Sequence, residues 1–168
     1  MAASLKIRMF GDPCLRQIST SLENVGLPQR MIIQSMIATM HQEKGVGLAA
    51  PQVGINQRFF VADVGDGPIA IINPHIIRES GLAEMEEGCL SIPEVLIKVQ
   101  RSEKIVLRYM DEEGKLIEKA FSELMARVIL HETDHLDGKL IVDYASFFEK
   151  QKYKKQLKML ESSYVGDQ

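Results

Sequence analysis

Apolar residues recur at three- and four-residue intervals in the segment 28–42, which is the spacing of an amphipathic helix. Pro28 suits the first turn of such a helix, because a first turn leaves its N–H groups unpaired and proline has none. The apolar stripe comprises Ile32, Ile33, Met36, Ile37 and Met40. A second amphipathic helix is expected over 147–161, and its apolar face holds Tyr153, Leu157 and Leu160.

Segments rich in β-forming residues occupy the middle of the chain, between groups of turn-forming residues. The expected strands are 58–64, 69–72, 104–110 and 115–120, and the last two form a hairpin. A helix is then predicted from Ser122, a capping residue, to about Leu136, where Gly138 is placed to end it. This order predicts an α+β fold, with 1–168 as a single domain and antiparallel strands packed around the helix of 122–136.

Composition is typical of a globular protein and excludes several classes. The chain has 168 residues, of which 45% are hydrophobic and 26% charged, and a net charge of −3. The acidic balance excludes a global basic footprint, so we expect no sequence-specific binding of nucleic acid. No apolar run approaches the roughly 18 residues that cross a membrane, and the first residues lack the apolar core of a secretory signal. With two cysteines a disulfide framework is excluded, and we expect a cytoplasmic location.

The segment His131-Glu132-Thr133-Asp134-His135 is the strongest chemical signal in the sequence. Residues four apart lie on one face of a helix, so both imidazoles can reach one metal ion. Glu132 lies about 100° further round the helix, where it can address a metal-bound water without being a ligand. The histidines also continue the stripe of Leu124 and Val128, which predicts that they point inward. A surface histidine pair, or core histidines bonded to backbone groups, is the alternative interpretation.

A catalytic metal site of this kind needs a third protein ligand and keeps one position open. In H-E-x-x-H proteases that ligand lies downstream, where this chain offers Asp137, Asp143, Glu149, Glu161 and Asp167. Upstream stands Cys89, and the preceding Gly88 permits close approach of the backbone. Cys89 would complete a Cys/His/His set suited to iron(II) or zinc. A lone cysteine is more often a small buried hydrophobe, which is our interpretation of Cys14.

Three motifs in series resemble those of the peptide deformylase family. They are Gly45-Val46-Gly47-Leu48-Ala49-Ala50-Pro51-Gln52, Glu87-Gly88-Cys89-Leu90-Ser91 and His131-Glu132-Thr133-Asp134-His135. Their order and spacing match the family, and the resemblance extends from about Arg8 to Ala145. It implies a bacterial-type enzyme that removes the formyl group from N-formylmethionyl nascent peptides. It also implies one divalent metal ion, iron(II) in most members, with zinc, nickel or cobalt as substitutes.

Carried over by position, the resemblance implies a role for each motif. The implied metal ligands are Cys89, His131 and His135. Glu132 is the implied general acid/base, whereas Gln52 and the backbone N–H of Leu90 are implied to hold the developing oxyanion. The peptide groups of Gly47 are implied to bind the substrate backbone. The expected pocket for the methionine side chain, chosen by nearness to the motifs, comprises Val46, Met85, Glu87 and Val128.

Two positions depart from the pattern of the family. Leu130 precedes the helix motif where glutamine is frequent, which we interpret as the loss of a polar contact near the ligands. Leu96 stands where some members carry an arginine that binds the substrate backbone, so we expect weaker or different binding further along the peptide. An H-E-x-x-H metalloendopeptidase with a downstream carboxylate ligand is the alternative function, and a non-catalytic relative is a third.

Positive charge gathers near the end of the chain. The window 147–161 holds five lysines against two glutamates, although the whole chain is acidic. In bacterial deformylases a basic C-terminal helix can dock on the ribosome, and phosphate groups attract such lysines. The resemblance therefore implies a ribosome-docking helix here, and a solvated amphipathic helix packed on the core is the alternative.

Overall fold

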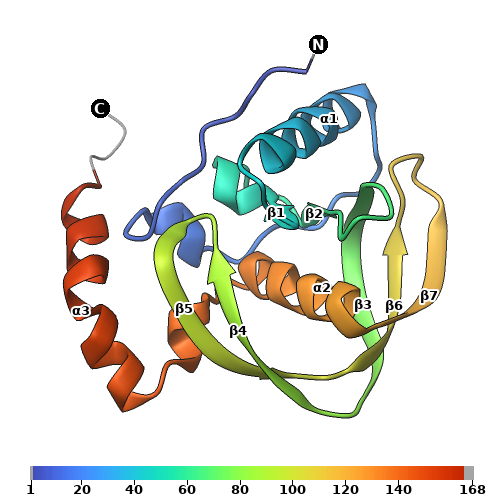
Figure 1. Ribbon diagram of the computed structural model, residues 1–168. Helices are drawn as coiled ribbons and strands as arrows, with labels where there is room; N and C mark the ends of the chain where they lie inside the picture. Colours follow the sequence, from blue (N-terminus) through green and yellow to red (C-terminus); the bar gives the residue numbers. More distant parts are fainter. Residues whose placement is uncertain (1, 165–168) are drawn as a thin grey trace.

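Two antiparallel sheets carry the fold in the computed structural model, which describes residues 2–164 (Figure 1). The larger sheet has five strands in the order β1-β2-β3-β6-β7. Its strands are β1 (Gly47–Ala49), β2 (Phe59–Ala62), β3 (Ile69–Ser80), β6 (Lys104–Met110) and β7 (Leu116–Ser122). The smaller sheet pairs β4 (Ala83–Cys89) with β5 (Ile92–Arg101). The α+β fold expected from the order of elements is confirmed.

Three α-helices pack around these sheets within the described residues. They are α1 (Leu27–Gln42), α2 (Glu123–Leu136) and α3 (Phe147–Ser162). Short 3-10 turns occur as well: η1 (Pro13–Arg16) precedes α1, η2 (Ala50–Val53) follows β1, and η3 (Ile141–Tyr144) lies between α2 and α3. In Figure 1, α2 occupies the centre, α1 lies at the top, and α3 lies at the left beside β5. No helix in this part of the chain is both long and apolar enough to cross a membrane.

Hydrophobic side chains form clusters on both faces of the large sheet and around the small one. One cluster joins α2 to the sheet and includes Phe60, Ile129 and Leu130. A second places Ile33, Met36 and Met40 of α1 against the sheet, which confirms the stripe predicted for this helix. The third joins β5 to η3, and there α3 contributes Tyr153, Leu157 and Leu160, the face predicted from their spacing.

The β4–β5 pair was not among the expected strands. In β5 buried and exposed residues alternate from Val95 to Arg101, so a signal of period two is present there. β4 carries no such signal, because its sequence AEMEEGC is largely polar and its one buried acid, Glu87, is neutralised by partners from elsewhere. The expected strand 69–72 is also too short, since β3 continues past Asn73 to Ser80, with two shifts of its register against β6.

Ser122 and Gly138 mark the two ends of α2. Ser122 occupies the predicted cap position, but its side chain makes no capping hydrogen bond. At the other end Gly138 has a φ of +72°, the left-handed conformation that glycine adopts without strain. A Cβ atom on Gly138 would lie 2.6 Å from the carbonyl oxygen of Arg16. Gly138 therefore ends the helix and lets the η1 backbone pack closely against it.

We expect Gly138→Ala to lower the free energy of unfolding by about 2 kcal/mol, because it adds a backbone clash to the strain of a left-handed alanine. The matched control is Gly114→Ala, since Gly114 has a φ of +82° but no atom within 4 Å of an added Cβ. Urea denaturation of both variants separates the two effects. Equal losses of stability in the two variants would contradict a role for the Gly138–Arg16 contact.

Candidate metal centre

Three side chains that can bind a metal converge beneath β4. Cys89 ends β4, whereas His131 and His135 lie one turn apart on α2. Their ligand atoms all lie within 4.8 Å of one another. The Cys89 Sγ is 3.4 Å from His135 Nε2, and the two imidazole rings meet edge to face at 5.0 Å between centroids. The structure thus brings together the three residues that the motifs imply as ligands.

The chemistry of this donor set fits a catalytic metal. One thiolate and two imidazoles suit iron(II) or zinc and leave a fourth position for water or substrate. His131 donates from Nδ1 to Glu87, which leaves its Nε2 as the metal-binding nitrogen. His135 is buried at 1% exposure, as expected for an inward-pointing ligand. By contrast, Leu124 of the predicted inward stripe is 43% exposed and lies at the mouth of the cavity.

Three of the downstream carboxylates that a protease-type site would use are engaged elsewhere. Asp137 pairs with Arg58 at 2.9 Å, and Asp143 pairs with Arg16 at 2.7 Å. Glu149 accepts hydrogen bonds from the backbone at the start of α3 and from Lys98 N. Glu161 lies in the last part of α3, with its backbone against Gly11. Asp167 lies outside the described residues. The geometry therefore provides Cys89 as the third donor.

Glu132 is a buried carboxylate beside the ligands. Its Oε1 lies 3.8 Å from His131 Nε2, and its Oε2 has no hydrogen-bond partner. Burial raises the pKa of Glu132 to about 7, so this group can both accept and release a proton near neutral pH. A Cβ atom on Gly47 would lie 2.6 Å from Glu132 Oε1, so only glycine leaves room for the carboxylate there.

Gln52 has its amide group fixed from both ends. The Ala49 N–H donates to its Oε1 at 2.9 Å, which turns the NH₂ group towards β4. That group donates to Ser91 Oγ at 3.1 Å and lies 3.5 Å from Cys89 Sγ. Gln52 is only 1% exposed, and its amide donors therefore sit in a protected position beside the thiol.

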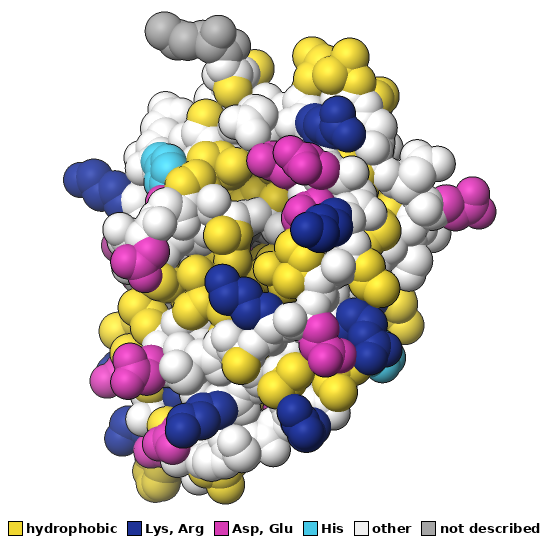
Figure 2. Space-filling view, turned by 90° about the vertical axis from the view of Figure 1, so that its right-hand side faces the viewer, with side chains coloured by type: hydrophobic (Ala, Val, Ile, Leu, Met, Phe, Trp, Pro, Cys, Tyr) yellow, Lys and Arg dark blue, Asp and Glu magenta, His cyan; other side chains and the backbone are white. Residues whose placement is uncertain are grey.

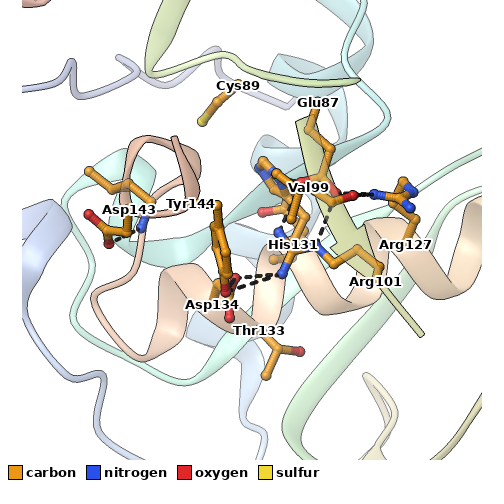
Figure 3. A network of polar contacts seen from close by, with 12 residues as sticks. Glu87, Cys89, Val99, Arg101, Arg127, His131, Thr133, Asp134, Asp143 and Tyr144 are labelled. Atoms are coloured by element: carbon orange, nitrogen blue, oxygen red, sulfur yellow. Dashed lines mark hydrogen bonds and ion pairs between the residues drawn. The ribbon is translucent and has the colours of Figure 1, made fainter. Parts of the chain in front are cut away.

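Glu87 lies behind His131 and is held by two arginines (Figure 3). It accepts a 2.9 Å bond from His131 Nδ1, two bonds from Arg101 and one of 2.6 Å from Arg127. Burial alone would raise the pKa of Glu87, but the bonds from His131 and Arg101 lower it to about 2. Glu87 lines the cavity, as expected for the pocket, while its carboxylate serves to orient His131.

The two histidines titrate in opposite directions. Burial opposes charge on His131, but hydrogen bonds to Cys89 and Glu87 outweigh burial and raise its pKa well above the usual range. For His135, burial and the neighbouring His131 both lower the pKa. Without a metal His135 is therefore the neutral imidazole of the pair. Both histidines must be neutral to bind a metal, so an ion that binds would displace the proton from Nε2 of His131.

A cavity of about 340 Å³ opens beside the donors. Val46, Met85 and Val128, which were predicted to form the methionine pocket, line it together with Gly47, Gln52 and Leu90. Val128 is buried, whereas Val46 and Met85 are 46% and 50% exposed and form its apolar mouth. Figure 2 shows one face of the molecule, on which hydrophobic side chains gather around a central hollow.

The two departures from the family pattern lie away from the ligands. Leu130 is buried in the cluster between α2 and the large sheet, so its apolar side chain is explained by core packing rather than by a lost polar contact near the ligands. Leu96 is 47% exposed and packs over Gly88, where an added Cβ would lie 3.3 Å from Leu96 Cδ2. It faces away from α2, on the outer side of the β4–β5 pair.

Sequence reasoning did not identify the residues that hold Glu87. These are Arg101 at the end of β5 and Arg127 on α2. Nor did it identify the two residues that bond behind Arg101, Asp134 within the helix motif and Tyr144 at the end of η3. Arg127 precedes His131 by four residues, so the helical spacing could have placed it on the same face. Tyr144 offers no such signal, because only the tertiary fold brings η3 beside β5.

Comparison with known proteins gives one consistent family. The profile of the polypeptide deformylase family matches residues 4–151. A peptide deformylase of Thermotoga neapolitana is 48% identical over 139 residues, which covers 82% of this chain and 85% of that protein. The crystal structure of the Thermotoga maritima enzyme superposes with a TM-score of 0.83 at 46% identity, over 85% of this chain and 98% of that one. The structure of a peptide deformylase from Synechococcus elongatus in complex with actinonin superposes with a TM-score of 0.87 at 39% identity, over 90% of this chain and 85% of that one.

We expect Cys89→Ser to weaken zinc binding by more than about 100-fold, since even residues behind the ligands change metal affinity by 10- to 100-fold. The other cysteine supplies the control, because Cys14 packs in the β5–η3 cluster and Cys14→Ser should keep wild-type affinity. Competition with a chromophoric chelator measures the zinc dissociation constant of each variant. Unchanged zinc affinity in Cys89→Ser would place the third ligand elsewhere.

Proposed function

The chain belongs to the polypeptide deformylase family, and from this premise we infer which of its residues carry out the reaction. A deformylase is a metal-dependent hydrolase that cleaves the N-terminal formyl group from formylmethionyl nascent peptides and releases formate. The observation that supports the assignment best is the convergence of Cys89, His131 and His135 beside the buried carboxylate of Glu132. In this proposal the three converging residues hold the metal.

Iron(II) is the working ion in this proposal, with zinc, nickel or cobalt as substitutes. A single thiolate beside two imidazoles is a donor set that these ions share, and family resemblance favours iron among them. When bound, the ion supplies Lewis acidity, which polarises a carbonyl oxygen and favours deprotonation of water near neutral pH. Residues of the chain carry out the remaining steps, and the cytoplasm is the proposed place of action.

Glu132 moves the proton in this mechanism. Its carboxylate accepts a proton from the water that attacks the formyl carbon. It then delivers that proton to the nitrogen of the departing peptide as the carbon–nitrogen bond breaks, so that formate and a free amine result. The unpartnered Oε2 and the pKa of about 7 suit both halves of this transfer.

Negative charge that develops on the formyl oxygen needs donors fixed in advance. Gln52 suits this role, since Ala49 and Ser91 hold its amide in place. The backbone N–H of Leu90 is the second proposed donor, and Leu90 lines the same cavity. Each preorganised donor of this kind contributes about 3 kcal/mol to the stability of a transition state.

The substrate backbone is proposed to enter as an added strand. β1 is the outermost strand of the large sheet, and β4 pairs on one side with β5, so both strands have an edge beside the cavity. Main-chain groups of Gly47 on β1 can bond an extended peptide there, in the manner of β-strand addition. Val46, Met85 and Val128 then receive the methionine side chain.

We expect Glu132→Gln to retain its metal but to release formate about 1,000-fold more slowly than the wild type, because the proton carrier is lost. Formate release from a formyl-Met tripeptide is measured on protein reconstituted anaerobically with iron(II), with nickel and zinc in parallel. Glu118→Gln is the matched control, since Glu118 lies on β7 in an exposed pair with Arg108. Wild-type turnover by metal-loaded Glu132→Gln would remove Glu132 from the mechanism.

The ribosome is a proposed partner, bound through α3. This helix carries five exposed lysines, Lys150, Lys152, Lys154, Lys155 and Lys158, and lies at one side of the molecule (Figure 1). Its apolar face is already packed on the core, so the lysines remain available to phosphate groups. We infer that residues 1–168 act as one catalytic domain to which this basic helix adds the docking surface.

We expect reversal of Lys154, Lys155 and Lys158 to glutamate to abolish co-sedimentation with ribosomes at low salt and to leave hydrolysis of a formyl-Met tripeptide unchanged. The control reverses three exposed lysines of the β6–β7 hairpin, Lys104, Lys115 and Lys119, which changes the net charge equally. Equal losses of ribosome binding in both variants would show that total charge, and not α3, sets the affinity.

A further inference from the structure

A series of polar contacts begins at His131 on α2 and returns to the same helix at Asp134. His131 donates to Glu87 at 2.9 Å, and Glu87 accepts two 2.9 Å bonds from Arg101. Arg101 then donates to Asp134 at 2.7 Å, three residues beyond His131 on the same helix. Arg127, four residues before His131, holds Glu87 from the other direction at 2.6 Å. The carboxylate that orients the ligand is therefore fixed from both flanks of that ligand.

These charges lie where water cannot replace a lost partner. Arg101, Glu87 and Arg127 have side chains only 6% to 8% exposed. Removing one member of a buried ion pair leaves the charge of the other uncompensated, and the side chain that remains shifts towards another partner. A change at the far end of the chain of contacts should therefore displace Glu87 and, with it, the imidazole of His131.

Tyr144 of η3 contacts the last two members of this series, Arg101 and Asp134 (Figure 3). Its hydroxyl donates to Asp134 at 2.6 Å, and its ring lies against the guanidinium of Arg101, with Cζ 4.9 Å from the centroid. Burial and the neighbouring Asp134 raise the pKa of Tyr144 to about 12, so the phenol keeps its proton and remains a donor. Tyr144 thereby fixes Asp134 and shields Arg101 from water.

We propose that Tyr144 and Asp134 are positioning residues for the metal, which act through Arg101 and Glu87 on the orientation of His131. Neither residue touches the cavity beside the donors, and neither is a ligand in the proposed function on which this inference rests. Glu87 bonds to the ligand directly, so variants of Glu87 set the upper limit of the effect. Such indirect partners change metal affinity by about 10- to 100-fold, and a residue further out should change it less.

The test compares Tyr144→Phe, which keeps the ring and removes one hydroxyl, with Asp134→Asn and with Tyr153→Phe as the control. Tyr153 lies on α3 and packs in the β5–η3 cluster. We expect Tyr144→Phe to bind zinc about 3- to 10-fold more weakly and Asp134→Asn about 10-fold more weakly, whereas Tyr153→Phe matches the wild type. The visible spectrum of the cobalt(II)-loaded proteins should shift in the first two variants, and kcat should fall with KM unchanged.

A double-variant cycle tests whether the effect passes through Glu87. In a Glu87→Gln background, Tyr144→Phe should cause no further loss of zinc affinity, because the connection is already broken. Additive losses would overturn the proposal. So would a lowered melting temperature of Tyr144→Phe together with unchanged zinc affinity and cobalt spectrum, since that pattern belongs to a purely structural role.

The same measurements separate this inference from the function beneath it. If wild-type protein binds cobalt(II) without a thiolate charge-transfer band, the Cys89 metal site itself is wrong. If the band is present and Tyr144→Phe leaves it unchanged, the metal site stands and the positioning role is wrong.

Discussion

A single buried carboxylate connects the architecture of this protein to its chemistry. Glu87 is removed from water at a point where β4, β5 and α2 meet, and it stays ionised there because Arg101, Arg127 and His131 all donate to it. The desolvation of that charge is tolerable only while every partner is in place. The small sheet is thus held to the central helix by the same contacts that orient His131, a proposed metal ligand, so the fold and the candidate site share one set of interactions.

Much of the fold could be predicted from the sequence, because it depends on interactions between residues close together in the chain. The apolar stripes of α1 and α3 and the glycine that ends α2 follow from helix periodicity and from the conformational freedom of Gly138, and they need no knowledge of the tertiary structure. The spacing of His131 and His135 is likewise a property of one helix. Cys89 became a convincing third ligand by resemblance of its motif, since periodicity alone left the downstream carboxylates open.

What the sequence could not show depends on contacts between distant segments. The sequence of β4 is polar and is typical of a loop. It forms a strand with Glu87 buried because arginines from β5 and α2 pair with that carboxylate. Leu130 was misinterpreted for a related reason: the next residue in the sequence is the proposed ligand His131, but the side chain of Leu130 packs in the core against the large sheet. Tyr144 lies 57 positions from Glu87 in the sequence, and nothing in its local pattern distinguishes it from Tyr153.

The free edges of β1 and β4 have a consequence for how copies of this protein behave towards one another. Exposed strand edges are templates on which a second sheet can grow, and long flat edges promote aggregation. β1 has only three residues, so it offers a very short edge on which the sheet of a neighbouring molecule could grow. β4 exposes the acidic side chains of Glu84 and Glu86, and two copies aligned there would bring like charges together. The opening that is proposed to admit one extended peptide thus offers little edge for sheet formation with a second copy of the folded protein.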